Sequence, residues 1–417
     1  MSHDHDDMLW RAEALQRVMA IRESALDDQP RESVSLDGIA GRTLATDLVA
    51  DEDSPPADYA TMDGYAFDAT EEYPYTLREE ETFPEDDPLS LRSGEAVPIA
   101  TGAPLPPEAN AVLKREDATV TDGQLQGTDI DPGTYTYERA SNVRAGETLF
   151  AADERLSPKD AILLGDLGYE TVETVAPFSV AVLATGTEIH EGRSDDLDSA
   201  MLMGLVRAWG HDPTYEGTVP DEYDRVESRI GALADQYDVV LTTGGTSVGK
   251  KDYVVRALNA LGEVRFHRVR LRPGKPLVCA TLPDAVVFGI PGKPLGAHTI
   301  TSLVVRPFFT GETSLPTLEA TFEVDLALGP DGFEYVVPVT LAGGTETTDG
   351  DERAGPDERR AIPMGHVDSP LSVYESTFDP SVLSSRTRAT RADGFVITTE
   401  PLEAGEQVSV VPYSVVS

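Results

Sequence analysis

Nearly continuous apolar runs alternate with amphipathic segments in the middle of this chain. Residues 178–186 (FSVAVLATG) and 238–245 (DVVLTTGG) have the composition of strands that are covered on both faces. Residues 199–210 and 222–237 carry apolar side chains at helical spacing. This alternation predicts a doubly wound, mostly parallel α/β sheet, in which ligands bind beyond the carboxyl ends of the strands.

The pattern changes on both sides of this region. Residues 8–26 have the spacing of an amphipathic helix, and a second helix is expected to begin at Ser157 and to stop at Gly168. The acidic stretch 70–140 is broken by Pro, Thr and Gly into short strand-like pieces, which predict a small β-domain. Beyond about residue 315 the alternation of apolar and polar residues predicts a second β-domain.

The charge of the chain disfavours one class of partner. There are 74 acidic and 33 basic residues in 417, a formal net charge of -41, so a nucleic-acid partner is disfavoured. The acids recur along the whole chain, which is typical of a folded protein with an acidic surface from a salt-loving cell. No apolar run reaches the roughly 20 residues of a membrane span, and the first residues lack a secretory signal pattern, so a cytoplasmic protein is expected.

Lysines are rare and unevenly distributed. Four of the six fall between residues 250 and 293, beside glycine-rich turns, which favours an anion-binding site over local chance. Two of these turns read Pro-Gly-Lys-Pro, so that rigid prolines flank Lys275 and Lys293 and reduce the entropy lost on binding. The lysines are Lys114, Lys159, Lys250, Lys251, Lys275 and Lys293.

The stretch TTGGTSVGKKD, residues 242–252, is close to a phosphate-binding P-loop. It has Lys251 where a P-loop needs the hydroxyl of Ser or Thr, so an ATPase is the weaker interpretation. The backbone N–H groups of Gly244, Gly245 and Gly249 could instead form an anion-binding nest. The carboxylates of Glu188 and Asp252 could supply oxygen ligands to Mg²⁺.

Six short motifs follow one another along the chain: MDGYA, TGAPLP, ATGTE, TTGGTSVGKKDY, LRPGKPL and GIPGKP. In the first of them, Asp63-Gly64 has the composition of a type I′ turn. Together they resemble the molybdopterin molybdenumtransferase family (MoeA), to which the gephyrin E domain is related, and a haloarchaeal member is expected. The resemblance implies several domains. They are an N-terminal linker and helical domain (1–51 and 141–176), an inserted β-domain (52–140), a central doubly wound α/β/α domain like MoaB and MogA (177–315) and a C-terminal β-barrel (316–417).

The resemblance also implies a reaction, the insertion of molybdate into adenylylated molybdopterin with release of AMP. It implies a homodimer in which Asp63 and Thr101 approach the site from the partner subunit, and an adenylyltransferase-type protein as a possible upstream partner. Glu188 and Asp252 would bind Mg²⁺ or assist cleavage of the phosphoanhydride, and the catalytic Lys275 would hold the pterin phosphate and the molybdate dianion together with the glycine turns. The expected molybdopterin- and molybdate-binding residues are Thr185, Gly186, Gly244, Gly245, Ser247, Gly249, Arg272, Pro273, Gly274, Pro291, Gly292 and Lys293.

Some positions depart from the family pattern. Thr148, Thr187 and Ala200 stand where members usually carry an acid or an amide, and Lys293 and Gly296 replace an Asn and a Ser. The expected site has therefore lost carboxylates and gained a cation. Two interpretations stay open, a preference for another oxyanion such as tungstate, and a non-catalytic relative that binds the pterin as a scaffold.

Overall fold

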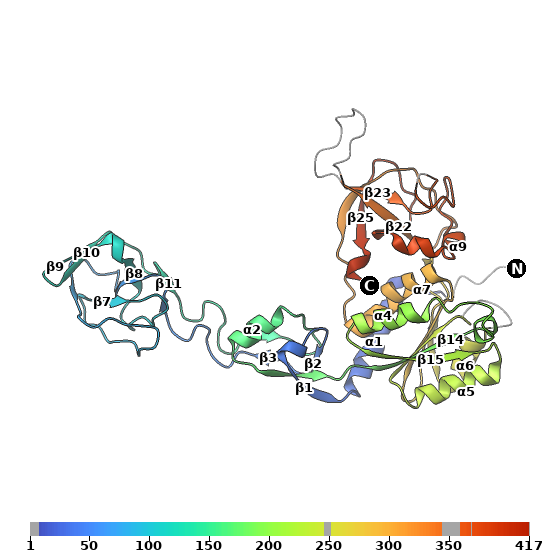
Figure 1. Cartoon of the computed structure of the whole chain (residues 1–417), viewed down its shortest axis with the longest axis horizontal. Helices are drawn as coiled ribbons and strands as arrows, with labels where there is room; N and C mark the ends of the chain where they lie inside the picture. The colour runs from blue at the N-terminus through green and yellow to red at the C-terminus, as the bar shows by residue number, and fades with distance from the viewer. Residues whose placement is uncertain (1–7, 246–251, 344–358, 368, 417) are drawn as a thin grey trace. The chain divides into compact units, whose positions relative to one another are not determined.

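The computed structural model describes residues 8–245, 252–343, 359–367 and 369–416 (Figure 1). The chain forms two compact units. The larger unit comprises Met1–Thr43, Arg155–Pro158 and Glu173–Ser417, and the smaller unit comprises Leu44–Glu154 and Lys159–Val172. Within the described ranges, no helix is both long and apolar enough to cross a membrane.

The smaller unit is built on a six-stranded sheet in the order β8-β5-β7-β6-β10-β9. Two short pairs, β3–β12 and β4–β11, and the helix α2 (Asp160–Asp166) complete the unit. The strands are β3 (Leu48–Val49), β4 (Tyr59–Ala60), β5 (Gly64–Phe67), β6 (Tyr75–Leu77), β7 (Glu95–Ile99), β8 (Ala111–Lys114), β9 (Ala118–Thr121), β10 (Gln124–Gly127), β11 (Thr136–Tyr137) and β12 (Thr148–Phe150).

Two local predictions in this region are wrong. Gly64 is the first residue of β5 and lacks the positive φ of a type I′ turn. Glycine is required there because a Cβ atom would lie 2.1 Å from the carbonyl oxygen of Leu113. The helix expected from Ser157 begins later, as α2 (Asp160–Asp166), although it does end before Gly168, whose φ is +83°.

The core of the larger unit is a six-stranded mixed sheet in the order β15-β14-β16-β20-β19-β17. Its first four strands are parallel, and β19 is antiparallel to both of its neighbours. The helices follow the strands as predicted, and α5 and α6 pack together over one apolar face. The strands are β14 (Ser179–Thr185), β15 (Asp212–Val219), β16 (Val239–Thr243), β17 (Glu263–His267), β19 (Val278–Thr281) and β20 (Val286–Ile290).

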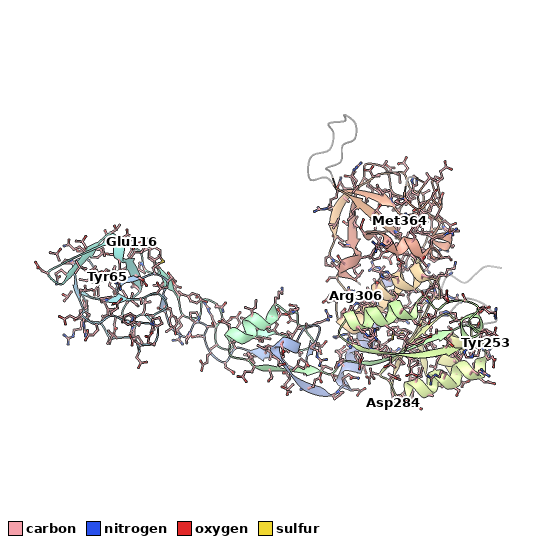
Figure 2. All side chains as sticks on the ribbon, in the orientation of Figure 1. Tyr65, Glu116, Tyr253, Asp284, Arg306 and Met364 are labelled. Carbon is pink, nitrogen blue, oxygen red and sulfur yellow. The ribbon has the colours of Figure 1, made fainter. Side chains whose placement is uncertain are left out.

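The helices of this unit connect the strands of the sheet and cover it. Helix α1 packs against α8 and the π-helical turn η3. The helices are α1 (Arg11–Asp27), α3 (Thr187–His190), α4 (Ser199–Ala208), α5 (Tyr223–Ala234), α6 (Tyr253–Leu261, its first residue labelled in Figure 2), α7 (Pro294–Ile300), η3 (Thr301–Val305) and α8 (Arg306–Thr310). A further sheet, in the order β1-β13-β2, is formed by Arg31–Ser35, Thr171–Val175 and Thr43–Leu44.

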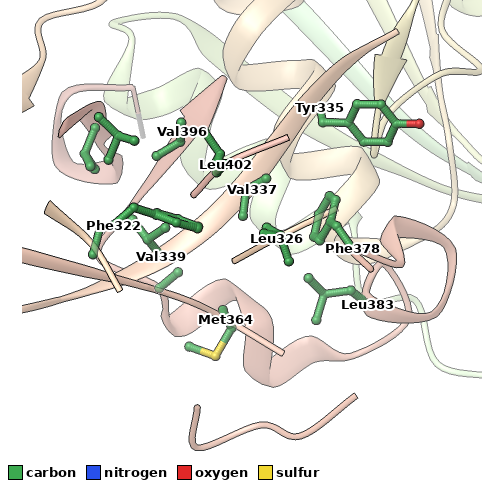
Figure 3. Close-up of a cluster of buried hydrophobic side chains, with 14 of the residues drawn as sticks. Phe322, Leu326, Tyr335, Val337, Val339, Met364, Phe378, Leu383, Val396 and Leu402 are labelled. Atoms are coloured by element: carbon green, nitrogen blue, oxygen red, sulfur yellow. The ribbon is translucent and has the colours of Figure 1, made fainter. Parts of the chain in front are cut away.

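The C-terminal region is a closed five-stranded barrel, as predicted. Its strands pair in the order β22-β23-β21-β25-β24, and β24 pairs back to β22. Buried apolar side chains, including Phe322, Val337 and Phe378, fill the interior (Figure 3). The elements are β18 (Leu271–Arg272), which extends β22, then β21 (Leu318–Phe322), β22 (Glu334–Ala342), β23 (Arg360–Pro363), α9 (Pro380–Leu383), β24 (Gly394–Thr398) and β25 (Gln407–Pro412). The sequence between β22 and β23 is rich in acidic residues, and most of it lies outside the described residues.

Candidate functional site: a cationic cavity

A cavity of about 360 Å³ lies in the larger unit, beyond the carboxyl ends of β16 and β20. Among the described residues that line it, three are cationic and none is acidic. The lining residues are Gly244, Gly245, Leu271, Arg272, Pro273, Gly274, Lys275, Pro276, Pro291, Gly292, Lys293, Gly296, Pro380, Ser381 and Ser384. The structure thus brings together eight of the twelve predicted binding residues with Lys275.

Parallel pairing places two of the motif turns side by side. Thr243 pairs with Ile290 at the ends of β16 and β20, and the N–H of Gly244 donates to the carbonyl oxygen of Ile290 at 2.9 Å. Gly244 has a φ of +81°, and a Cβ atom there would lie 2.8 Å from the carbonyl oxygen of Thr185. Only glycine allows this approach, so the turn after β16 is set by backbone geometry.

Thr185 and Gly186 support the cavity without lining it. The buried hydroxyl of Thr185 donates to the carbonyl oxygen of Thr243 at 2.9 Å, which links the ends of β14 and β16. Gly186 has a φ of +141° and directly precedes the short helix α3. These two predicted binding residues therefore position the neighbouring turn. Ser247 and Gly249, like Lys250 and Lys251, lie outside the described residues.

The cations of the cavity are held by apolar and backbone groups. The guanidinium carbon of Arg272 lies 4.0 Å from the ring centre of Phe333, and the Nζ of Lys275 lies 5.8 Å from it. Burial lowers the pKa of Lys275, and the positive charges of Arg272 and Arg268 lower it further. Within the described ranges, no Asp or Glu forms an ion pair with Arg272, Lys275 or Lys293. An anion is the ligand that this charge distribution favours.

Sequence reasoning missed two features of the site. Arg268 has a left-handed backbone with a φ of +74°, and its charge acts on both Lys275 and Asp252. Its Nε atom is buried and has no hydrogen-bond partner in the described structure. The second feature is α9, whose Pro380 and Ser381 line the cavity. The pair Asp379-Pro380 has the form of a helix cap followed by proline, and could have indicated this short helix.

The two predicted Mg²⁺ ligands lie apart from the lining of this cavity. Asp252 is half-buried and caps α6, accepting a bond from the N–H of Val255 at 3.4 Å. Burial raises the pKa of Asp252, whereas this bond and Arg268 lower it. Glu188 is exposed on α3. The described part of the chain holds no group of three His, Cys, Asp or Glu that could bind a metal alone, so Mg²⁺ here would need ligand oxygens as well.

Asp63 and Thr101 belong to the smaller unit. Both the N–H and the hydroxyl of Thr101 donate to one carboxylate oxygen of Asp63, at 2.7 Å each. Thr101 lines a second cavity of about 500 Å³, together with Tyr59, Tyr137 and Asp166 among others. The two motifs, 38 residues apart in the sequence, therefore form one local feature.

Comparison with known proteins adds a family context to this geometry. The family model "MoeA N-terminal region (domain I and II)" matches residues 11–168, and "Probable molybdopterin binding domain" matches residues 181–311, which include most of the cationic cavity. A molybdopterin molybdenumtransferase of Haemophilus influenzae is 29% identical over 288 residues, which are 66% of this chain and 71% of the relative. The Nostoc enzyme of the same name is 30% identical over 286 residues, 64% of this chain and 66% of the relative.

Solved structures give the same result for nearly the whole chain. A crystal structure of a molybdopterin biosynthesis MoeA protein from Pyrococcus horikoshii aligns with a TM-score of 0.69 at 26% identity. The match covers 97% of this chain and 99% of that protein. A second structure from the same organism aligns with a TM-score of 0.72 at 22% identity, over 97% and 100% of the two chains, and supports the fold.

Proposed function

Because this chain belongs to the MoeA family, we propose that it is a molybdenumtransferase of molybdenum cofactor biosynthesis that inserts molybdate or tungstate into adenylylated molybdopterin and releases AMP. Relatives named molybdopterin molybdenumtransferase support the transferase role. The exact reaction rests on the chemistry of the site.

The cationic cavity carries the proposal. The substrates, an oxyanion and a phosphorylated pterin nucleotide, are negative, and the cavity presents Arg272, Lys275 and Lys293 without an acid among its described lining residues. In a chain with a net charge of -41, such a site concentrates anions that the rest of the surface repels. Positioning and charge neutralisation dominate catalysis when an oxyanion approaches a phosphoanhydride, so the cavity needs no covalent nucleophile.

Two carboxylates outside the lining of the cavity fit a role in the same reaction. Mg²⁺ binds through one or two carboxylates together with substrate phosphates, and Asp252 and Glu188 have the right oxygen chemistry for that arrangement. When bound, the ion would neutralise charge on the phosphoanhydride. Asp252 would be held in place for this by its position at the start of α6.

The proposal includes a homodimer, in which the Asp63–Thr101 pair of the partner completes the site. Its basis is the preorganised pair on the smaller unit and the adjoining cavity of about 500 Å³. An enzyme that adenylylates molybdopterin would have to supply the substrate, and an adenylyltransferase-type protein is the proposed upstream partner.

The test supplies adenylylated molybdopterin, Mg²⁺ and either molybdate or tungstate at high salt, and follows AMP by chromatography. We expect oxyanion-dependent AMP release. Pterin binding without AMP release would favour the non-catalytic scaffold and overturn the enzyme. ATP hydrolysis in the absence of any pterin would support the P-loop ATPase instead.

A further inference from the structure

Lys293 is a cation of the cavity that forms no ion pair with any carboxylate in the described part of the chain. We propose that Lys293 is a specificity-determining residue that makes this cavity prefer doubly charged tetrahedral oxyanions over singly charged ones. The inference rests on the proposed function for its biological meaning, but it concerns anion binding alone and can be tested without any pterin.

The position of Lys293 is fixed by two elements from different parts of the larger unit. Lys293 directly precedes Pro294, the first residue of α7, and its own side chain is exposed. Its Nζ atom donates to the carbonyl oxygen of Ser381 in α9 at 3.0 Å. Beside it, the N–H of Leu295 donates to the carbonyl oxygen of Ser384 at 3.2 Å. The helix α9 and the residue that follows it therefore hold both the backbone next to Lys293 and the end of its side chain.

This arrangement lowers the entropic cost of using a lysine as an anion ligand. A free lysine side chain loses up to about 2 kcal/mol of rotamer entropy when it is immobilised. The bond to Ser381 restricts the side chain before any ligand arrives, which is preorganisation. An ammonium group has three donors, and a single neutral carbonyl occupies one of them, so two remain for an anion.

The other two cations are constrained differently. Arg272 is stacked on Phe333, and Lys275 is partly buried with a lowered pKa. Lys293 is exposed, so its charge can be removed with little effect on packing. Since Coulomb energy scales with the product of the charges, losing this ammonium should weaken the binding of a dianion about twice as much, in free energy, as that of a monoanion.

The experiment measures dissociation constants by calorimetry at fixed ionic strength for the whole protein. Molybdate is the free tetrahedral dianion, perrhenate is a tetrahedral monoanion, and AMP supplies a phosphate monoester. The variants are Lys293→Asn, Lys293→Arg and, as a matched control, Lys159→Asn at an exposed lysine of the smaller unit. We expect Lys293→Asn to weaken molybdate or AMP binding about three- to fivefold and perrhenate binding about twofold, with Lys293→Arg and the control close to wild type.

Selective weakening of molybdate would identify the free oxyanion as the ligand of Lys293, and selective weakening of AMP would identify the phosphate monoester. An equal loss of affinity for molybdate and perrhenate, or no loss of affinity for any of the anions, would overturn the proposal. A purely structural role for Lys293 is detected by hydrogen exchange of the α9 amides. Faster exchange in Lys293→Asn with unchanged anion affinity would show that the lysine serves only as a link to Ser381.

This test is independent of the reaction. Absence of AMP release from the wild-type protein would remove the proposed activity, while Lys293-dependent discrimination of the two tetrahedral anions would still stand. Conversely, normal AMP release by Lys293→Asn with unchanged anion preference would leave the activity intact and refute the role of Lys293.

Discussion

Asp63 accepts two hydrogen bonds from Thr101, one from its N–H and one from its hydroxyl, both at 2.7 Å. The backbone bond is the main cause of the lowered pKa of Asp63, and the hydroxyl bond is the second. Arg115 contributes a smaller lowering, and burial acts in the opposite direction. The pair therefore presents a preoriented, ionised carboxylate on the surface of the smaller unit.

Replacing Thr101 by Val should raise the pKa of Asp63 towards its ordinary value. The substitution removes the hydroxyl donor and leaves the backbone N–H in place, so a partial rise is expected. Carboxyl resonances of ¹³C-labelled Asp, followed as a function of pH, measure this directly. The internal control is Asp68, which accepts an equivalent pair of bonds from Thr70. An unchanged Asp63, or an equal change at Asp68, would contradict the assignment.

Asp252 caps α6, and its carboxylate is also a proposed ligand of Mg²⁺, so two substitutions separate these roles. Asparagine caps helices about as well as aspartate, whereas alanine costs roughly 1 kcal/mol of stability. We expect Asp252→Asn to keep the melting temperature of the wild type and to lose most oxyanion-dependent AMP release. Asp252→Ala should have both a lower melting temperature and little AMP release. If Asp252→Asn retains the wild-type rate and Mg²⁺ dependence, the carboxylate has only its capping role.

A matched control for this pair is Asp379, which caps α9 through the N–H groups of Ser381 and Val382. Asp379→Asn should preserve both stability and AMP release, because only its capping bonds are needed. Loss of activity in this control would show that any change at a helix start near the cavity disturbs the site, and would weaken the interpretation of Asp252.

Much of the site could be predicted because it depends on features that are local in sequence. The glycines and prolines that follow β16 and β20 set their own turns, and parallel pairing of two buried strands brings those turns together. The six motifs likewise indicated the family, which the comparisons confirm. The closed barrel followed from the same resemblance, since alternation alone predicts strands but not the pairing of β22 with β24.

The contacts that the sequence did not reveal depend on long-range packing. Ser381 lies 88 residues from Lys293, and its contribution is a backbone carbonyl that any residue type could supply. Arg268 acts through its charge and an unusual backbone conformation that no local pattern marks. Gly64 fits both a turn and a close strand contact, and only the approach of Leu113 decides between them.

The lowered pKa of Lys275 predicts a pH-dependent affinity for anions. Burial and the charges of Arg272 and Arg268 favour the neutral amine, so the ammonium is lost at a lower pH than in an ordinary lysine. Affinity for molybdate should therefore fall as the pH rises through this lowered pKa. Lys275→Arg should keep its affinity over the same range, and Lys275→Met should bind weakly at every pH. Calorimetric titrations of the three proteins give the comparison, and parallel pH profiles for wild type and Lys275→Arg would refute the assignment.

His211 predicts a pH dependence of stability that has nothing to do with the cavity. It is buried, its Nδ1 accepts from the N–H of Phe178, and its Nε2 donates to the carbonyl oxygen of Phe309, both at 3.0 Å. Burial is the main reason that its pKa falls from 6.5 to about 4, and nearby arginines, including Arg155, add to the effect. Between these values the unfolded chain binds a proton that the folded protein does not, so stability must fall as the pH drops.

The expected loss is up to about 1.4 kcal/mol per pH unit below pH 6.5, and roughly 3 kcal/mol in total. Denaturant unfolding of wild type and His211→Asn from pH 8 to pH 5.5 tests this before most carboxylates begin to titrate. The variant should be less stable throughout, because one of the two backbone partners of His211 loses its bond, but its disadvantage should shrink steadily below pH 6.5. A constant difference across the range would mean that the folded protein protonates His211 normally, in conflict with its buried, neutral state.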